Sequence, residues 1–192
     1  MKLTKLLLPI GTLACAVLGG SCSDPVLDDA IDAQGNETEG IAKGEFHRAG
    51  QRCVVCHQEG GEASNSPFTL AGTVFAQPAK QIGVDNVEIR LTDSDGSKHT
   101  AQTNCVGNFF VRPTDWQPKF PILVEIFKNN VRRRMTSPIG REPDCAGCHV
   151  LDIPPQDPFS QIPHIYLFGS DEPGTPEGDP SCEVDPKRPG SP

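Results

Sequence analysis

The sequence predicts a mainly β protein: a small β-sandwich with short loop segments at both ends and an irregular, Pro-rich tail. Glycine and proline each occur 19 times in 192 residues, and only 36% of the residues are hydrophobic. This composition favours many turns around a modest core over a helical bundle. Short segments of alternating apolar and polar residues, separated by turn residues, occupy the middle of the chain.

Six short strands are expected in that middle region. In one of them Val87, Ile89 and Leu91 alternate with polar residues, the pattern of a strand with one buried face. Polar turn residues at 93–96 and 129–130 predict two hairpins. Strands of this length and spacing are typical of a sandwich. They are expected at residues 68–75, 87–91, 99–103, 109–111, 122–128 and 131–135.

Residues 1–21 are expected to be a secretory leader. Lys2 and Lys5 precede an apolar segment at residues 6–18, and small residues follow it. A membrane-spanning helix needs about 20 apolar residues, so this segment is too short to be an anchor. It has the pattern of a signal peptide, which predicts export to the periplasm or the outer membrane.

Cys22 is the expected lipidation site. It follows small residues and opens an acidic segment, residues 22–45, that we expect to be a flexible tether without a core. A lipid on this cysteine would associate the protein with a membrane. Cys15 is an alternative site, and leader cleavage without lipidation would release a soluble product.

A five-residue pattern, Cys-x-x-Cys-His, occurs twice and is the most specific feature of the chain. In covalent c-type haem attachment, two thiols with this spacing bond the two vinyl groups of one porphyrin, and the next imidazole ligates its iron. The pattern therefore predicts two covalently bound haem c groups. The copies consist of Cys53, Cys56 and His57, and of Cys145, Cys148 and His149.

Three other interpretations of the cysteine pairs remain open. Each could be a redox-active disulfide of the thioredoxin kind, although no βαβ pattern surrounds either copy. All four cysteines could bind one structural zinc, although the pairs lie much further apart than in zinc knuckles. Each pair could also form a plain disulfide. A histidine directly after both pairs favours haem over these alternatives.

The motifs divide the chain into segments. Haem segments are expected at residues 46–66 and 137–168, with the sandwich at 67–136 between them and a Pro- and Gly-rich tail at 169–192. Because the ends of a domain often lie close together, the two motifs are expected to be neighbours in space. The apolar cluster at residues 162–168 is expected to pack over a haem edge.

The second axial ligand of each iron has three candidates. His47 lies shortly before the first motif, Met135 shortly before the second, and His164 shortly after it. Histidine at this position lowers the reduction potential relative to methionine. Each candidate could instead be an ordinary loop or core residue. His99 is expected on a polar strand face at the surface.

Two cysteines remain outside the leader and the haem motifs. In an oxidising compartment Cys105 and Cys182 are expected to form a disulfide that fixes the tail to the sandwich. Arg132, Arg133 and Arg134 form a basic cluster in an otherwise acidic chain. These arginines could pair with haem propionates, dock an acidic partner, or simply be solvated.

The chain resembles exported bacterial dihaem c-type cytochromes that carry a carboxypeptidase-regulatory-like, transthyretin-related sandwich between two haem motifs. This resemblance covers about residues 46–150 and implies an Ig-like or transthyretin-like β-sandwich without catalytic residues. The haem motifs are its specific part, and its β part is a looser pattern. That β part comprises residues 71–75, 87–91, Asp95, Gly96, Thr103, Gly107, Asn108 and Phe109.

These observations favour an electron carrier over an enzyme. The net charge of −8 does not fit nucleic-acid binding, which needs a basic surface. The expected partners are therefore redox proteins or other cytochromes. One alternative is a peroxidase-like haem enzyme with one open iron position. Another is a surface-binding sandwich in which haem is structural or sensory.

Overall fold

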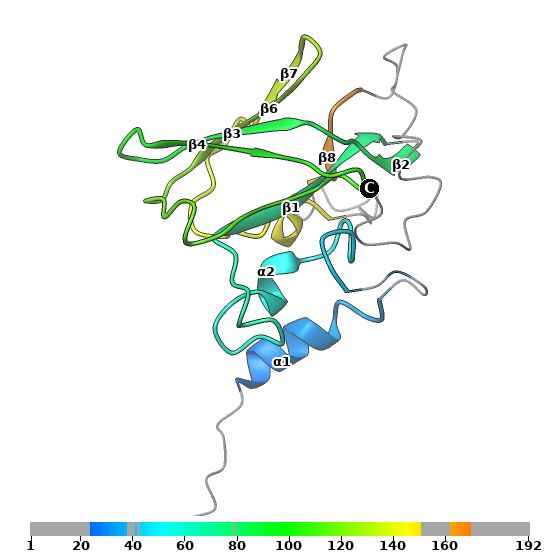
Figure 1. Ribbon diagram of the computed structural model, residues 1–192, viewed down its shortest axis with the longest axis vertical. Coiled ribbons are helices and arrows are strands. Elements are labelled where there is room, and N and C mark those ends of the chain that lie inside the picture. The colour runs from blue at the N-terminus through cyan, green and yellow to red at the C-terminus, as the bar shows by residue number, and fades with distance from the viewer. Residues whose placement is uncertain (1–23, 38–40, 42, 79, 151–161, 170–192) are drawn as a thin grey trace, which may run out of the picture.

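The computed structural model describes residues 24–37, 41, 43–78, 80–150 and 162–169 (Figure 1). The leader with Cys22, the tail with Cys182, and residues 151–161 lie outside this description. Among the described residues, no helix has both the length and the apolar character needed to cross a membrane.

The described chain is mainly β and forms two four-stranded sheets, which confirms the predicted class. In the first sheet β2, β1 and β5 are adjacent and antiparallel, and β8 pairs in parallel with β1. The second sheet is antiparallel in the order β4-β3-β6-β7. The strands are β1 (Leu70–Gln77), β2 (Lys80–Gly83), β3 (Glu88–Thr92), β4 (Lys98–Gln102), β5 (Asn108–Val111), β6 (Leu123–Lys128), β7 (Val131–Arg134) and β8 (Ile165–Tyr166).

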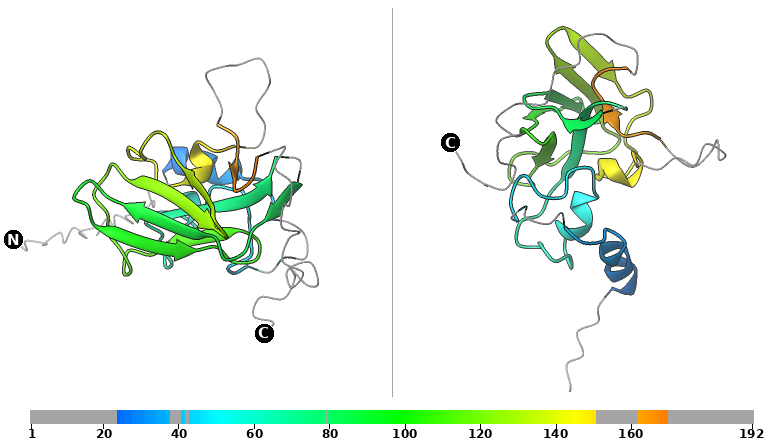
Figure 2. Two further views of the ribbon diagram at one scale, coloured as in Figure 1. Left: turned by 90° about the horizontal axis from the view of Figure 1, so that it is seen from above. Right: turned by 90° about the vertical axis from the view of Figure 1, so that its right-hand side faces the viewer.

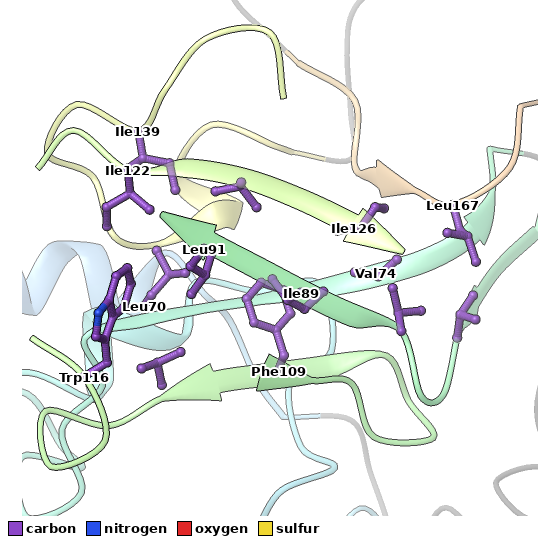
Figure 3. Packing of buried hydrophobic residues seen from close by; sticks show 14 of the residues in the cluster. Leu70, Val74, Ile89, Leu91, Phe109, Trp116, Ile122, Ile126, Ile139 and Leu167 are labelled. Atoms are coloured by element: carbon purple, nitrogen blue, oxygen red, sulfur yellow. The ribbon is translucent and has the colours of Figure 1, made fainter. Parts of the chain in front are cut away.

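The hydrophobic core lies between the two sheets (Figure 3). As the alternation predicted, Val87, Ile89 and Leu91 are all buried, at 0%, 0% and 1% exposure. Burial of such side chains supplies most of the stabilising free energy of a fold of this size. The remaining core residues are Leu70, Val74, Ala76, Val84, Phe109, Val111, Trp116, Ile122, Val124, Ile126, Ile139 and Leu167.

Strand β1 is buried along almost its whole length instead of alternating. One face packs in the sandwich core through Leu70 and Val74. The opposite face is covered by the first motif segment, where the Gly50 amide donates to the Thr73 hydroxyl, whereas Cys145 of the second motif contacts Gly72 on the core-facing side. Because both faces of β1 are covered, its residues do not alternate between buried and exposed. The strand connects the sandwich to the candidate site.

His99 was expected at the surface, and that expectation is wrong. The register of β3 and β4 pairs it with buried Leu91, so it faces the interior side of the sheet. There it is half-buried, and its ring stacks on Trp116 with the centroids 5.6 Å apart.

Three short elements were not predicted. Strand β2 pairs antiparallel with β1 in a stretch where no strand was expected. Helix α1 (Pro25–Asp32) lies within the segment expected to be a flexible tether, and the Asp24 side chain caps it. This helix lies beside the first motif, on the side away from the sheets (Figure 2). Strand β8 falls in the cluster expected over a haem edge, yet the neighbouring Leu167 is fully buried in the sandwich core.

Candidate functional site

The two Cys-x-x-Cys-His motifs lie side by side against β1, as predicted. The first forms the short helix α2 (Cys53–Cys56), and the second begins with the 3₁₀ turn η1 (Cys145–Gly147). The Val54 amide donates a hydrogen bond of 2.8 Å to the Asp144 carboxylate. Nearby, the Arg52 guanidinium bonds Glu142 at 3.2 Å. These two contacts join segments 90 residues apart in the sequence.

The loop after the first motif folds back over it. The Ala63 amide donates to the Cys56 carbonyl, and the Phe68 amide donates to the His57 carbonyl, each at 2.9 Å. Gly61 permits this close approach, because a Cβ at that position would lie 2.3 Å from the Cys56 carbonyl oxygen. The loop thereby closes one side of a cavity.

That cavity has a volume of about 490 Å³, which lies within the usual range for small-molecule sites. Cys53, Cys56 and His57 all line it, together with His47. Thus the two cysteines and the histidine of one motif face the same space as a predicted distal ligand. Its aromatic lining is formed by Phe68, Phe109 and Phe110, and its basic side chains are Lys43, Arg48 and Arg112.

The His57 imidazole is oriented by two contacts. Its Nδ1 lies 2.6 Å from the Ser66 carbonyl oxygen. A carbonyl only accepts, so Nδ1 carries the proton and the Nε2 lone pair remains available for a metal. The ring also stacks on Phe68, with centroids 3.9 Å apart and planes 10° apart. His57 is therefore held in the tautomer that a proximal ligand requires.

His47 lies at a suitable distance to be the opposite ligand. The centroids of the His47 and His57 rings are 6.1 Å apart, and their planes differ by 15°. Two metal–nitrogen bonds of about 2.0 Å, with each ring centre about 1 Å behind its nitrogen, require a centroid separation of about 6 Å. The separation of the two rings therefore matches a pair of axial imidazoles, but in this structure the rings are stacked nearly parallel, and ligation also requires a nitrogen of each ring to point at the ion.

The present hydrogen bond of His47 does not match that role. The Gly44 amide donates to its Nδ1 at 2.9 Å, which leaves the proton of a neutral ring on Nε2. Burial lowers the pKa of His47, with Glu37 opposing and His57 adding to the decrease, so the neutral form is favoured. Ligation through Nε2 requires this ring to release the Gly44 bond.

A polar network fixes the segment that carries His47. The Asn108 amide donates to the backbone carbonyls of Glu45 and His47, at 3.2 and 3.1 Å. The Thr73 hydroxyl donates to Asn108 at 2.7 Å and accepts from the Gly50 amide at 2.8 Å. Strands β1 and β5 thus position the first motif segment through the buried side chains of Thr73 and Asn108, neither of which was predicted to be a site residue.

The second motif packs more closely on the sandwich. A Cβ at Gly72 would lie 2.7 Å from the Cys145 Cβ and 2.8 Å from its Sγ, so only glycine allows this contact. The His149 Nδ1 lies 2.7 Å from the Pro163 carbonyl oxygen. By the same reasoning as for His57, this contact leaves Nε2 free for a metal.

Both predicted distal ligands of the second motif lie near His149. Met135, His149 and His164 line one groove of about 200 Å³, next to apolar side chains of β6 and β8. The groove is smaller than the first cavity and below the usual range for small-molecule sites. His164 is 6% exposed and packs against Phe75, with ring centroids 4.9 Å apart.

The environment of the thiols differs from that of a redox-active cysteine pair. Burial raises the pKa of Cys53 to about 12, and the Asp144 carboxylate adds to the increase. Burial also raises the pKa values of Cys56 and Cys145. Reactive disulfide cysteines have lowered pKa values, so these thiols do not fit the thioredoxin-like alternative.

The described residues contain no group of three or more His, Cys, Asp or Glu side chains arranged to hold a metal ion. The four motif cysteines thus give no geometric support to a shared zinc site. They are also free thiols, which gives the plain-disulfide alternative no support. Cys105 is disulfide-bonded, and its expected partner, Cys182, lies outside the described residues.

The basic cluster on β7 interacts mainly with the protein itself. Arg132 and Arg134 both pair with Glu125, and Arg133 donates to the Leu167 carbonyl oxygen at 3.1 Å. Arg133 and Arg134 nevertheless line the groove beside His149. Side chains already paired with the protein are less available to haem propionates or an acidic partner.

Comparisons with known proteins give no relative for this chain. No family model matches it, and neither a curated protein nor a solved structure matches.

Proposed function

We propose that this protein is an exported dihaem c-type cytochrome that relays electrons and catalyses no reaction of its own. The observation that carries the proposal is the pairing of the motifs. Two Cys-x-x-Cys-His segments lie against each other, and each directs its histidine Nδ1 to a backbone carbonyl. Two independent copies of this arrangement are expected if both imidazoles ligate iron through Nε2.

The lining of the first cavity supports the proposal for one haem. Its aromatic lining would cover the porphyrin faces, and Cys53 and Cys56 lie at its wall for thioether bonds. Among the described residues Arg112 has no carboxylate partner and lies over the Phe110 ring, which makes it the preferred anchor for a propionate. The second groove is smaller, so a haem there would be less enclosed.

Bound haem would supply the one-electron ferric–ferrous couple. The protein's own contribution is to hold both imidazoles in one tautomer, exclude water from the first cavity and keep the motifs adjacent. The fixed network of Thr73 and Asn108 limits movement of the His47 segment when the iron charge changes. Small structural change on reduction is what outer-sphere electron transfer requires.

The sandwich acts in this proposal as a scaffold of the Ig-like or transthyretin-like kind. In this proposal strand β1 carries the site: its core-facing side contacts the second motif at Gly72, and its other face contacts the first motif segment at Thr73. The expected leader and Cys22 would place the protein in the periplasm or on the outer membrane, where its partners would be other redox proteins.

A redox titration of the purified holoprotein, followed by absorbance, tests this function. We expect two reversible one-electron components with different midpoint potentials, because the two sites differ in enclosure and in candidate ligands. Haems that do not cycle reversibly would contradict electron relay.

One observation favours a second candidate, a reductase-like haem enzyme with an open iron position. The Gly44 bond to His47 Nδ1 keeps the proton on Nε2 and so opposes ligation at the first site. Carbon monoxide binding by the resting reduced protein would support this candidate. Absence of binding would support two fully ligated irons.

A further inference from the structure

The carboxyl of Asp144 is buried at the junction of the two motifs. Its side chain is 1% exposed, and Oδ2 accepts the Val54 amide at 2.8 Å. The other oxygen, Oδ1, is buried, and no donor reaches it with full hydrogen-bond geometry, although a contact with the Ala146 amide lowers the pKa of the carboxyl. A buried carboxylate oxygen with so weak a donor is costly, because it has lost water and gained little in return.

The charges around Asp144 do not neutralise it fully. Arg52, directly before α2, faces it but also bonds Glu142 at 3.2 Å, and the Nε of Arg52 has no partner. Glu142 adds a second negative charge. The Cys53, Cys56 and Cys145 thiols also face the carboxyl, and as thioethers they would carry no charge. The single positive charge of Arg52 is therefore shared between the carboxylates of Asp144 and Glu142.

A group in this position responds to the charge of its neighbours. Reduction of an iron removes one positive charge from the site, which makes a nearby carboxylate harder to keep ionised and raises its affinity for a proton. Burial already raises the pKa of Asp144 to about 6, despite the opposing effects of the Val54 and Ala146 amides and of Arg52.

We propose that the Asp144 carboxyl takes up a proton when the haem pair is reduced and releases it on reoxidation. The inference rests on the proposed function. One electron from a one-electron reductant converts a ferric iron to ferrous, and one proton from solvent converts the Asp144 carboxylate to the acid. Asp144 would couple electron relay to proton binding through its place between the motifs.

The test measures midpoint potentials of the holoprotein between about pH 4 and pH 8 for three proteins: wild type, D144N and E142Q. Asp144→Asn removes the titration while keeping an oxygen that can accept the Val54 amide. Glu142→Gln is the matched control, since it removes a neighbouring carboxylate that is 42% exposed. Haem content and circular dichroism show that all three are folded.

We expect the wild-type potential to fall as the pH rises through this window. A tenfold greater proton affinity in the reduced form corresponds to a shift of 59 mV. Asp144→Asn should remove most of that shift, whereas Glu142→Gln should retain it, displaced to lower pH because Asp144 loses a neighbouring negative charge. An unchanged pH dependence in Asp144→Asn, or none in wild type, would overturn the inference while leaving electron relay intact.

Infrared difference spectra provide a readout that is independent of electron-transfer activity. Reduction of the wild type should produce a protonated-carboxyl C=O band that is missing in Asp144→Asn and present in Glu142→Gln. A band that persists in Asp144→Asn would assign the proton to another group and overturn the inference. A matured protein that contains no haem would overturn the proposed function as well.

Discussion

The two motifs have the same five-residue pattern but different surroundings. The first opens into a cavity of about 490 Å³ with a second histidine across from His57. The second borders a groove of about 200 Å³, where Met135 and His164 both lie near His149. In the proposed cytochrome the pattern would determine how haem is attached, whereas the surrounding loops and strands would determine its enclosure and distal ligand. The two sites should therefore differ in potential.

The largest expected effect comes from removing one attachment site at a time. C53S/C56S and C145S/C148S should each lose one of two haems, which mass spectrometry would measure. The first double variant should also unfold more easily, since its large cavity would lose the group that fills it. Equal loss of stability in both variants would contradict the inference that the first site encloses its haem more fully than the second.

His47 provides the next test of the comparison. His47→Ala should open the iron of the first site, raise its reduction potential and permit carbon monoxide binding, while the second site is unchanged. His99→Ala is the control, because His99 stacks on Trp116 away from both motifs. If carbon monoxide binds wild type and His47→Ala equally, His47 is not a ligand.

Met135 and His164 are the two candidate ligands for the second iron of the proposed cytochrome. Methionine ligation produces a near-infrared charge-transfer band in the oxidised protein, and Met135→Leu would abolish it. His164→Gln would leave the band in place in that case. A wild-type spectrum without the band would assign the position to His164 or leave it open.

Asp144 predicts a pH dependence of stability. Its pKa is raised from 3.8 in the unfolded chain to about 6 in the fold, so the native state binds more protons between these values. The stabilising contribution is present below the unfolded pKa and is lost as the pH rises through 6. Relative to D144N, wild type should lose about 2 kcal/mol between pH 4 and pH 7, because the unfolded carboxyl is already partly ionised at pH 4. Denaturant unfolding across this range measures the difference, and a constant difference would contradict it.

The smallest effect is expected at the contact between β1 and the second motif. Gly72→Ala forces a Cβ against Cys145 and should cost about 1–3 kcal/mol of unfolding free energy. Gly140→Ala is the matched control, because no atom lies within 4 Å of its added Cβ. Equal stability of the two variants would mean that the second motif is loosely packed.

The sequence predicted the sandwich where side chains alternate, as at Val87, Ile89 and Leu91. It could not predict the continuous burial of β1, because the second face is covered by residues far away in the chain. His99 was placed on the wrong face because the alternation in its own strand is weak, whereas its pairing with Leu91 decides the side. Pairing is a tertiary property that local pattern does not encode.

The motifs and their closeness were predictable, but the groups that orient them were not. The carbonyls of Ser66 and Pro163 are backbone atoms, so no residue type identifies them. Asn108 and Thr73 act through folded geometry alone. The sequence shows that Asp144 directly precedes the second motif. Its contact with Val54 of the first motif is a tertiary contact that the sequence does not show.

Mass spectrometry of the protein, matured in a host that assembles c-type cytochromes, tests the central claim most directly. We expect a coloured protein whose mass equals that of the mature polypeptide plus two haems. One haem should be on the peptide that contains Cys53 and Cys56, and the other on the peptide that contains Cys145 and Cys148. A colourless protein at the mass of the polypeptide alone would contradict it.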